Sequence, residues 1–141
     1  MFSNPIYFST FAALSELVVT AFVLTVMITN LRGQALRSKL LFGTLAYELL
    51  VNITYMVQRT VVVAENHPNP LSEWVGVVGA LHGVFSLVMF VGLIVVSVLA
   101  YRASKRGVAF FQQHRQLTVV FIALWLLSVG SGEVVYFLVY F

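Results

Sequence analysis

Ionisable side chains within long apolar stretches are the residues of this sequence whose chemistry stands out. The chain has no Asp, so acid–base chemistry falls to its Glu residues, of which Glu16, Glu48 and Glu133 each lie inside an apolar stretch. His82 lies inside another. Ionisable groups are costly within a bilayer, so they tend to face other helices and to mark functional sites.

One apolar stretch carries a polar stripe. Glu48, Asn52, Tyr55 and Arg59 follow one another at helical spacing, while most other residues around them are Leu, Val, Ile or Met. Residues three and four apart share one face of a helix. The sequence therefore predicts that this stripe is buried against other helices and that the opposite face meets lipid.

The polar residues also fall at similar depths. At about 1.5 Å per residue, antiparallel helices would place Glu16, Tyr55, His82 and Glu133 roughly 10–14 Å below one membrane surface, with Glu48 deeper. The sequence thus predicts a polar layer to which each of four helices contributes one of these side chains.

Three interpretations of this layer remain open. The first is a structural network in which Arg59 neutralises the carboxylates, because buried charges usually occur in pairs. The second is a metal site with His82, Glu16 and Glu133 as ligands, or a cofactor site formed by His82, Tyr55 and Arg59, with haem, copper or iron as candidates. One His with two carboxylates suits iron, manganese or zinc, whereas copper(I) prefers sulfur. The third is a quinone or proton-relay site that uses His82 and a carboxylate.

The composition identifies the class of protein to which these residues belong. Of the 141 residues, 60% are hydrophobic and only 9% are charged, whereas about a quarter of a soluble domain is charged. This excludes an ordinary soluble protein, and it excludes disorder, which needs low hydrophobicity. The absence of Cys excludes disulfides and thiolate-bound metal clusters. A net charge of +3 is too small to indicate a nucleic-acid partner.

Four apolar segments are long enough to cross a membrane as helices, which takes roughly 20 residues each. They span about residues 7–30, 40–63, 75–101 and 116–141. Short connections make consecutive helices antiparallel neighbours. We therefore expect an all-α integral membrane protein in which residues 1–141 form one transmembrane domain, an antiparallel up-down four-helix bundle.

The basic residues predict the orientation of this bundle. Seven of the eight Lys and Arg residues fall in the first and third connections, as Arg32, Arg37, Lys39, Arg102, Lys105, Arg106 and Arg115. Connections rich in Lys and Arg stay in the cytoplasm. We therefore expect a multi-pass protein of the cell membrane with both termini on the outer side.

A series of short motifs in residues 75–141 resembles a known family. The series comprises His82-Gly83-Val84, Tyr101-Arg102-Ala103, His114-Arg115, Trp125-Leu126, and Gly132 to Tyr136. Its order resembles domain-of-unknown-function family 420, four-span membrane proteins of bacteria and archaea that are linked to maturation of aa3-type haem-copper terminal oxidases. The resemblance implies a four-span fold and a partner complex in the membrane.

The chain also departs from this family. The family typically has His at the start of the second span and near its outer end, where this sequence has Arg37 to Lys39 and Tyr55 to Arg59. Only His82 and His114 correspond to family histidines. The resemblance therefore implies a member that keeps the scaffold without the full histidine set.

These observations favour a non-catalytic accessory or assembly component of a respiratory membrane complex, with a haem-copper terminal oxidase as the favoured complex. Its expected partners are membrane lipids and other integral membrane subunits. Two alternatives stay open. One is a metal-binding, haem-binding or electron-transfer protein that uses His82 with a buried Glu. The other is a proton or ion pathway formed by a homo-oligomer, with Glu48 and the polar layer along it.

Overall fold

Four long helices and one short helix make up the described part of the chain. A computed structural model describes the backbone of residues 5–65 and 72–141, and the side chains of residues 7–58, 74 and 76–141. The helices are α1 (Pro5–Leu31), α2 (Ser38–Glu65), α3 (Ser72–Lys105), α4 (Phe110–Gln113) and α5 (Arg115–Tyr140). By length and composition, α1, α2, α3 and α5 can each cross a membrane. The described residues therefore form an all-helical fold, with four candidate spans that begin and end within a few residues of the predicted ones.

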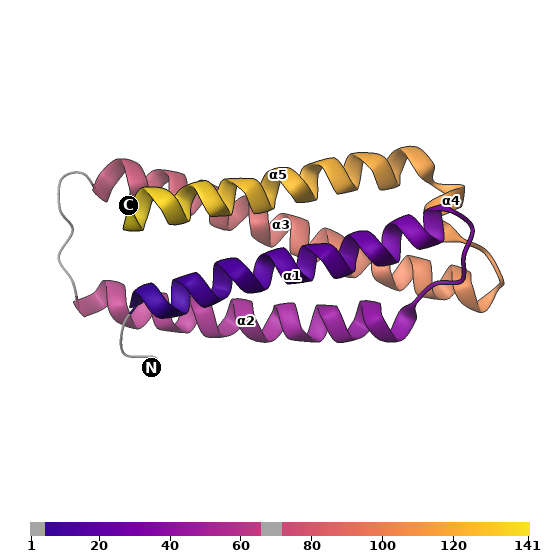
Figure 1. Ribbon diagram of the computed structural model, residues 1–141, viewed down its shortest axis with the longest axis horizontal. Coiled ribbons are helices and arrows are strands. Elements are labelled where there is room, and N and C mark those ends of the chain that lie inside the picture. The colour runs from indigo at the N-terminus through magenta and orange to yellow at the C-terminus, as the bar shows by residue number, and fades with distance from the viewer. Residues whose placement is uncertain (1–4, 66–71) are drawn as a thin grey trace.

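The long helices run alternately up and down (Figure 1). The start of α1 and the end of α5 lie at one end of the bundle, and α4 lies at the other. Helix α5 packs against α1 and α3, and α1 packs against α2, whereas α2 and α3 touch only slightly. The order around the bundle is therefore α1, α2, α3, α5, in which consecutive long helices are neighbours.

Threonines within the spans satisfy their hydroxyl groups without leaving the helix. Thr25 donates to the Ala21 carbonyl at 2.7 Å, and Thr44 donates to the Leu40 carbonyl at 2.7 Å. In both cases the acceptor lies one turn back on the same helix. Such side chains can therefore sit in an apolar helix without requiring water.

Each of the two connections at the α4 end has a glycine as its second residue. Gly33 follows α1 with φ +86° and Gly107 follows α3 with φ +73°, a conformation that glycine adopts without steric strain. The Gln34 amide reaches back to the Thr29 carbonyl at 3.1 Å, which closes the last turn of α1. The chain can therefore leave each helix abruptly and return along the next one.

The apolar core fills the half of the bundle nearer α4, and α4 forms part of it. Phe110 and Phe111 are both buried. Asn30, at the end of α1, is 2% exposed; its Oδ1 accepts from the Phe111 amide and its Nδ2 donates to the Gln34 carbonyl, both at 3.1 Å. The connection expected between the third and fourth spans thus contains a helical turn that is fixed to α1.

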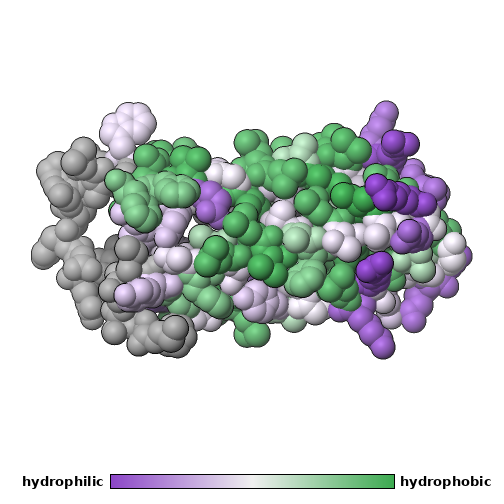
Figure 2. Space-filling model, in the orientation of Figure 1, coloured by the Kyte–Doolittle hydropathy of each residue, from purple (hydrophilic) through white to green (hydrophobic). Residues whose placement is uncertain are grey.

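Basic side chains gather at this same end. Figure 2 shows a hydrophobic band over the middle of the molecule and hydrophilic residues clustered at the α4 end. The seven basic residues of the two connections are all exposed. The bundle therefore has one strongly basic end.

Candidate functional site

A cavity of about 140 Å³ lies between α1, α2, α3 and α5, in the half of the bundle where α1 begins and α5 ends. We call it the polar chamber. Its polar lining consists of Ser9, Glu16, Asn52, Tyr55, His82, Ser86, Glu133, Tyr136 and Tyr140. This volume accommodates several water molecules or one small ligand.

The polar chamber brings together the four residues that the sequence places at one depth. Glu16 comes from α1, Tyr55 from α2, His82 from α3 and Glu133 from α5, and all four line it. The predicted convergence of four helices on one polar layer is therefore confirmed. The roles of these residues as ligands stay predictions.

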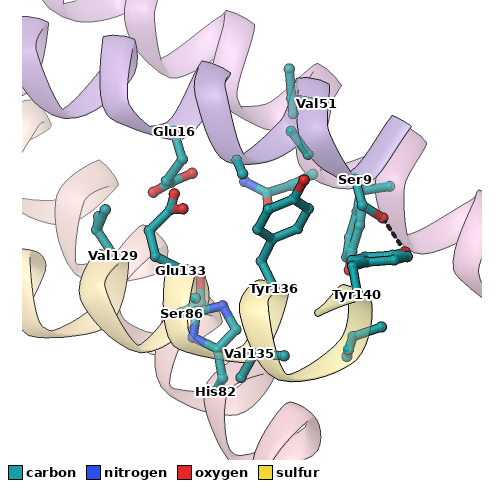
Figure 3. A pocket seen from close by; sticks show the side chains of 16 residues that line it. Ser9, Glu16, Val51, His82, Ser86, Val129, Glu133, Val135, Tyr136 and Tyr140 are labelled. Carbon is teal, nitrogen blue, oxygen red and sulfur yellow. Dashed lines mark hydrogen bonds between the residues drawn. The ribbon is translucent and has the colours of Figure 1, made fainter. Parts of the chain in front are cut away.

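Carboxyl groups from three helices approach one another here. Figure 3 shows Glu16 and Glu133 pointing toward each other across the polar chamber. The Glu16 carboxyl also lies beside that of Glu48, which is 3% exposed and does not itself line the polar chamber. Ionised carboxylates only accept hydrogen bonds, so neighbouring carboxyl groups bond to each other only through a proton or a cation. The arrangement is therefore suited to holding a proton or a cation.

The predicted stripe on α2 faces inward where its side chains are described. Asn52 donates to Glu48 Oε1 at 2.8 Å and to the Glu48 carbonyl at 3.0 Å. Glu48 Oε2 is buried, and the neighbouring Glu16 carboxyl can donate a hydrogen bond to Glu48 only when Glu16 is protonated. Tyr55 lines the polar chamber and stacks on Phe8, with ring centroids 6.2 Å apart. The side chain of Arg59 lies outside the described ones, and so does its predicted pairing with the carboxylates.

The protonation of one nitrogen of His82 follows from its hydrogen bonds. His82 Nδ1 lies 2.8 Å from Ser131 Oγ, and Ser131 Oγ donates to the Ser128 carbonyl at 2.7 Å. A hydroxyl has a single proton, so Ser131 must accept from His82. Nδ1 therefore carries a proton, and in the neutral ring Nε2 carries the lone pair.

Gly132 allows this histidine to approach α5. A Cβ atom at Gly132 would lie 2.8 Å from His82 Cε1 and 3.0 Å from Nε2, closer than packed atoms come. The ring edge therefore lies over a position without a side chain. Sequence reasoning missed Ser131 and Gly132 as site residues. Their only signal in the sequence is the run of small residues Ser128-Val129-Gly130-Ser131-Gly132.

Two tyrosines of α5 that line the polar chamber form hydrogen bonds to side chains of α1. The Tyr136 hydroxyl bonds Thr10 Oγ1 at 2.6 Å, and the Tyr140 hydroxyl bonds Ser9 Oγ at 2.7 Å, the bond drawn in Figure 3. Deeper in the bundle, Trp125 Nε1 donates to Thr20 Oγ1 at 3.1 Å. These bonds fix the register of α5 against α1.

The structure does not gather the predicted metal ligands into one coordination set. Within the described part of the chain, no three His, Asp or Glu side chains lie where they could share a metal ion. His82 is directed to Ser131 and Gly132, whereas Glu16 faces Glu48 and Glu133. These ligands share a depth and a chamber without converging on one point.

His114, the other histidine that the family resemblance carries over, lies at the far end of the bundle. It follows α4, is exposed, and packs its ring against Phe110 with centroids 4.6 Å apart. It therefore takes no part in the polar chamber.

Comparison with family models, curated proteins and solved structures finds no match to this chain. The function of the polar chamber is therefore argued from its own chemistry.

The closeness of His82 to α5 yields a prediction. Gly132→Ala would force the His82 ring away from Ser131, and overpacking of this kind costs about 1–3 kcal/mol of unfolding free energy. Gly130→Ala is the matched control, because nothing lies within 4 Å of a Cβ there. We expect the control to be neutral or up to about 1 kcal/mol more stable. Thermal unfolding of both variants in detergent measures the difference, and equal stability would contradict the packing described here.

Proposed function

We propose that this chain is a non-catalytic accessory or assembly component of a respiratory membrane complex, with a haem-copper terminal oxidase as that complex. The choice of complex rests on the family resemblance of residues 75–141. The observation that carries it is that three residues of the resemblance meet in space. His82 packs over Gly132, and both His82 and Tyr136 line the polar chamber.

The distribution of apolar surface supports partners within the bilayer. Almost every described residue belongs to a helix, and four of these helices are long and apolar enough to cross a membrane, so little of the described chain is left to contact soluble proteins. On α2, Leu50, Met56 and Val57 are each at least 60% exposed. Side chains of this kind require lipid or another membrane subunit to cover them. Helix α2 also has the slightest contact with its neighbour α3, which leaves much of its surface available.

The basic end supports one orientation. Because Lys and Arg are retained on the cytoplasmic side, we place the α4 end in the cytoplasm and the ends of α1 and α5 outside. The polar chamber then lies in the outer half of the cell membrane.

Co-purification tests this proposal. The tagged chain is extracted gently from its native membrane, and accompanying proteins, absorbance spectrum and metal content are measured on one sample. We expect oxidase subunits to accompany a chain that is itself colourless. Cells with Gly132→Ala should yield less assembled oxidase than cells with Gly130→Ala, since only the former displaces His82. Recovery of the chain alone with stoichiometric haem or metal would overturn the proposal.

The three neighbouring carboxyl groups favour a second candidate function, the uptake of protons or small cations. The carboxyl groups of Glu133, Glu16 and Glu48 follow one another in space, from α5 across α1 to α2. Intramembrane carboxylates arranged in this way are typical of proton relays. Toward the α4 end the buried side chains that the structure describes are uncharged: Met27 and Leu93 are fully buried, and the buried polar residues are Asn30, Thr44, Ser97 and Thr118. A complete pathway would therefore need a neighbouring copy of the chain.

Proton flux into liposomes tests this second candidate. If the chain forms such a pathway, Glu16→Gln should abolish a flux that the wild-type protein supports, because the middle one of the three carboxyl groups is lost. Thr54→Val is the control, since Thr54 is exposed and bonds only within its own helix. Absence of flux through the wild-type protein, or a flux that survives Glu16→Gln, would exclude the pathway.

A further inference from the structure

A second cavity, of about 360 Å³, lies at the opposite end from the polar chamber, where α3 ends and α4 begins. We call it the basic pocket. Its polar lining consists of Arg102, Arg106, Gln113 and His114, and Leu99 and Phe110 contribute to its apolar lining. None of its lining residues is shared with the polar chamber.

The basic pocket is suited to an anion. Arg102 and Arg106 both line one small cavity, and Gln113 and His114 add further hydrogen-bonding capacity. The three acidic residues whose side chains are described all lie at or beside the polar chamber. Guanidinium groups bind phosphate oxygens through paired, charge-assisted hydrogen bonds.

The position of the basic pocket selects the source of that phosphate. The apolar span of α3 ends at Lys105, so Arg102 and Arg106 lie at the level where lipid headgroups begin. Leu99 lines the cavity on the side toward the span and is 43% exposed. A headgroup held by the arginines would therefore leave its acyl chains beside the exposed apolar side chains of α3, such as Val95.

We propose that the basic pocket binds the phosphate of an anionic phospholipid, with Arg102 and Arg106 on the phosphate oxygens and His114 and Gln113 on the remaining headgroup atoms. Basic pockets between membrane helices on the cytoplasmic side are known to take such headgroups. A lipid in this position bridges the end of α3 and the α4–α5 junction, and so stabilises the connection between them.

Lys105 provides a matched control within the same turn of helix. Its Nζ lies 5.1 Å from the centre of the Tyr101 ring, and Tyr101 packs edge-on against Phe42 of α2. Lys105 does not line the basic pocket. Removing its charge therefore lowers the positive charge of the basic end by as much as removing one arginine does, and leaves the lining of the basic pocket unchanged.

The test measures thermal unfolding of the purified protein in detergent with added short-chain phosphatidylglycerol, with phosphatidylcholine of the same chains, or with inorganic phosphate. We expect only phosphatidylglycerol to raise the unfolding temperature. Its apparent affinity should fall about tenfold or more in Arg102→Gln and in Arg106→Gln. In Lys105→Gln it should fall only about fivefold or less.

Three outcomes would overturn the proposal. An equal loss in all three variants would assign the effect to diffuse surface charge. Stabilisation by inorganic phosphate as strong as that by the lipid would assign the pocket to a free anion. Equal stabilisation by the two lipids would show that the headgroup charge is not recognised. Native mass spectrometry, which counts bound phosphatidylglycerol, gives a second reading for any variant with altered stability.

Discussion

The absence of water from the hydrocarbon interior of a bilayer is the constraint on which the placement of most described polar side chains within the spans depends. Each such group must find its partner within the protein. Threonines therefore bond to carbonyls of their own helix, and hydroxyl groups pair between helices, as Ser15 and Tyr47 do at 2.8 Å. The three Glu residues and the His of the spans find their neighbours mainly on other helices, apart from the bond that Asn52 donates to Glu48 within α2. They converge on the polar chamber, where Glu16 and Glu133 face each other.

The same constraint divides the bundle into two unlike halves. Near the start of α1 and the end of α5, the small residues Gly132 and Ser131 allow α3 to pack closely against α5, and the polar chamber lies in this half of the bundle. Near α4, Phe111 and the bonds of Asn30 close the bundle with an apolar core. The polar chamber and the basic pocket therefore lie at opposite ends of the bundle.

Much of this arrangement could be predicted from the sequence, because helix rise and alternating direction fix the depth of a residue. Glu16, Tyr55, His82 and Glu133 were placed at one depth on that basis, and they line one chamber. Depth does not fix the direction of a side chain, so the sequence does not reveal that His82 points to Ser131 while Glu16 and Glu133 face each other. The hydrogen bond between Ser131 and His82 depends on how α3 packs against α5. A contact between particular residues of two helices produces no periodic pattern in the sequence.

The chain has no cysteine, so single introduced cysteines can report directly on the central claim that four helices enclose a polar chamber. Ser86 lines the chamber, whereas the adjacent Leu87 is 57% exposed on the outer surface of the bundle, where lipid would cover it. A small, membrane-impermeant thiol reagent added outside intact cells should label Ser86→Cys and leave Leu87→Cys unlabelled. Labelling of Leu87→Cys with protection of Ser86→Cys would contradict the account.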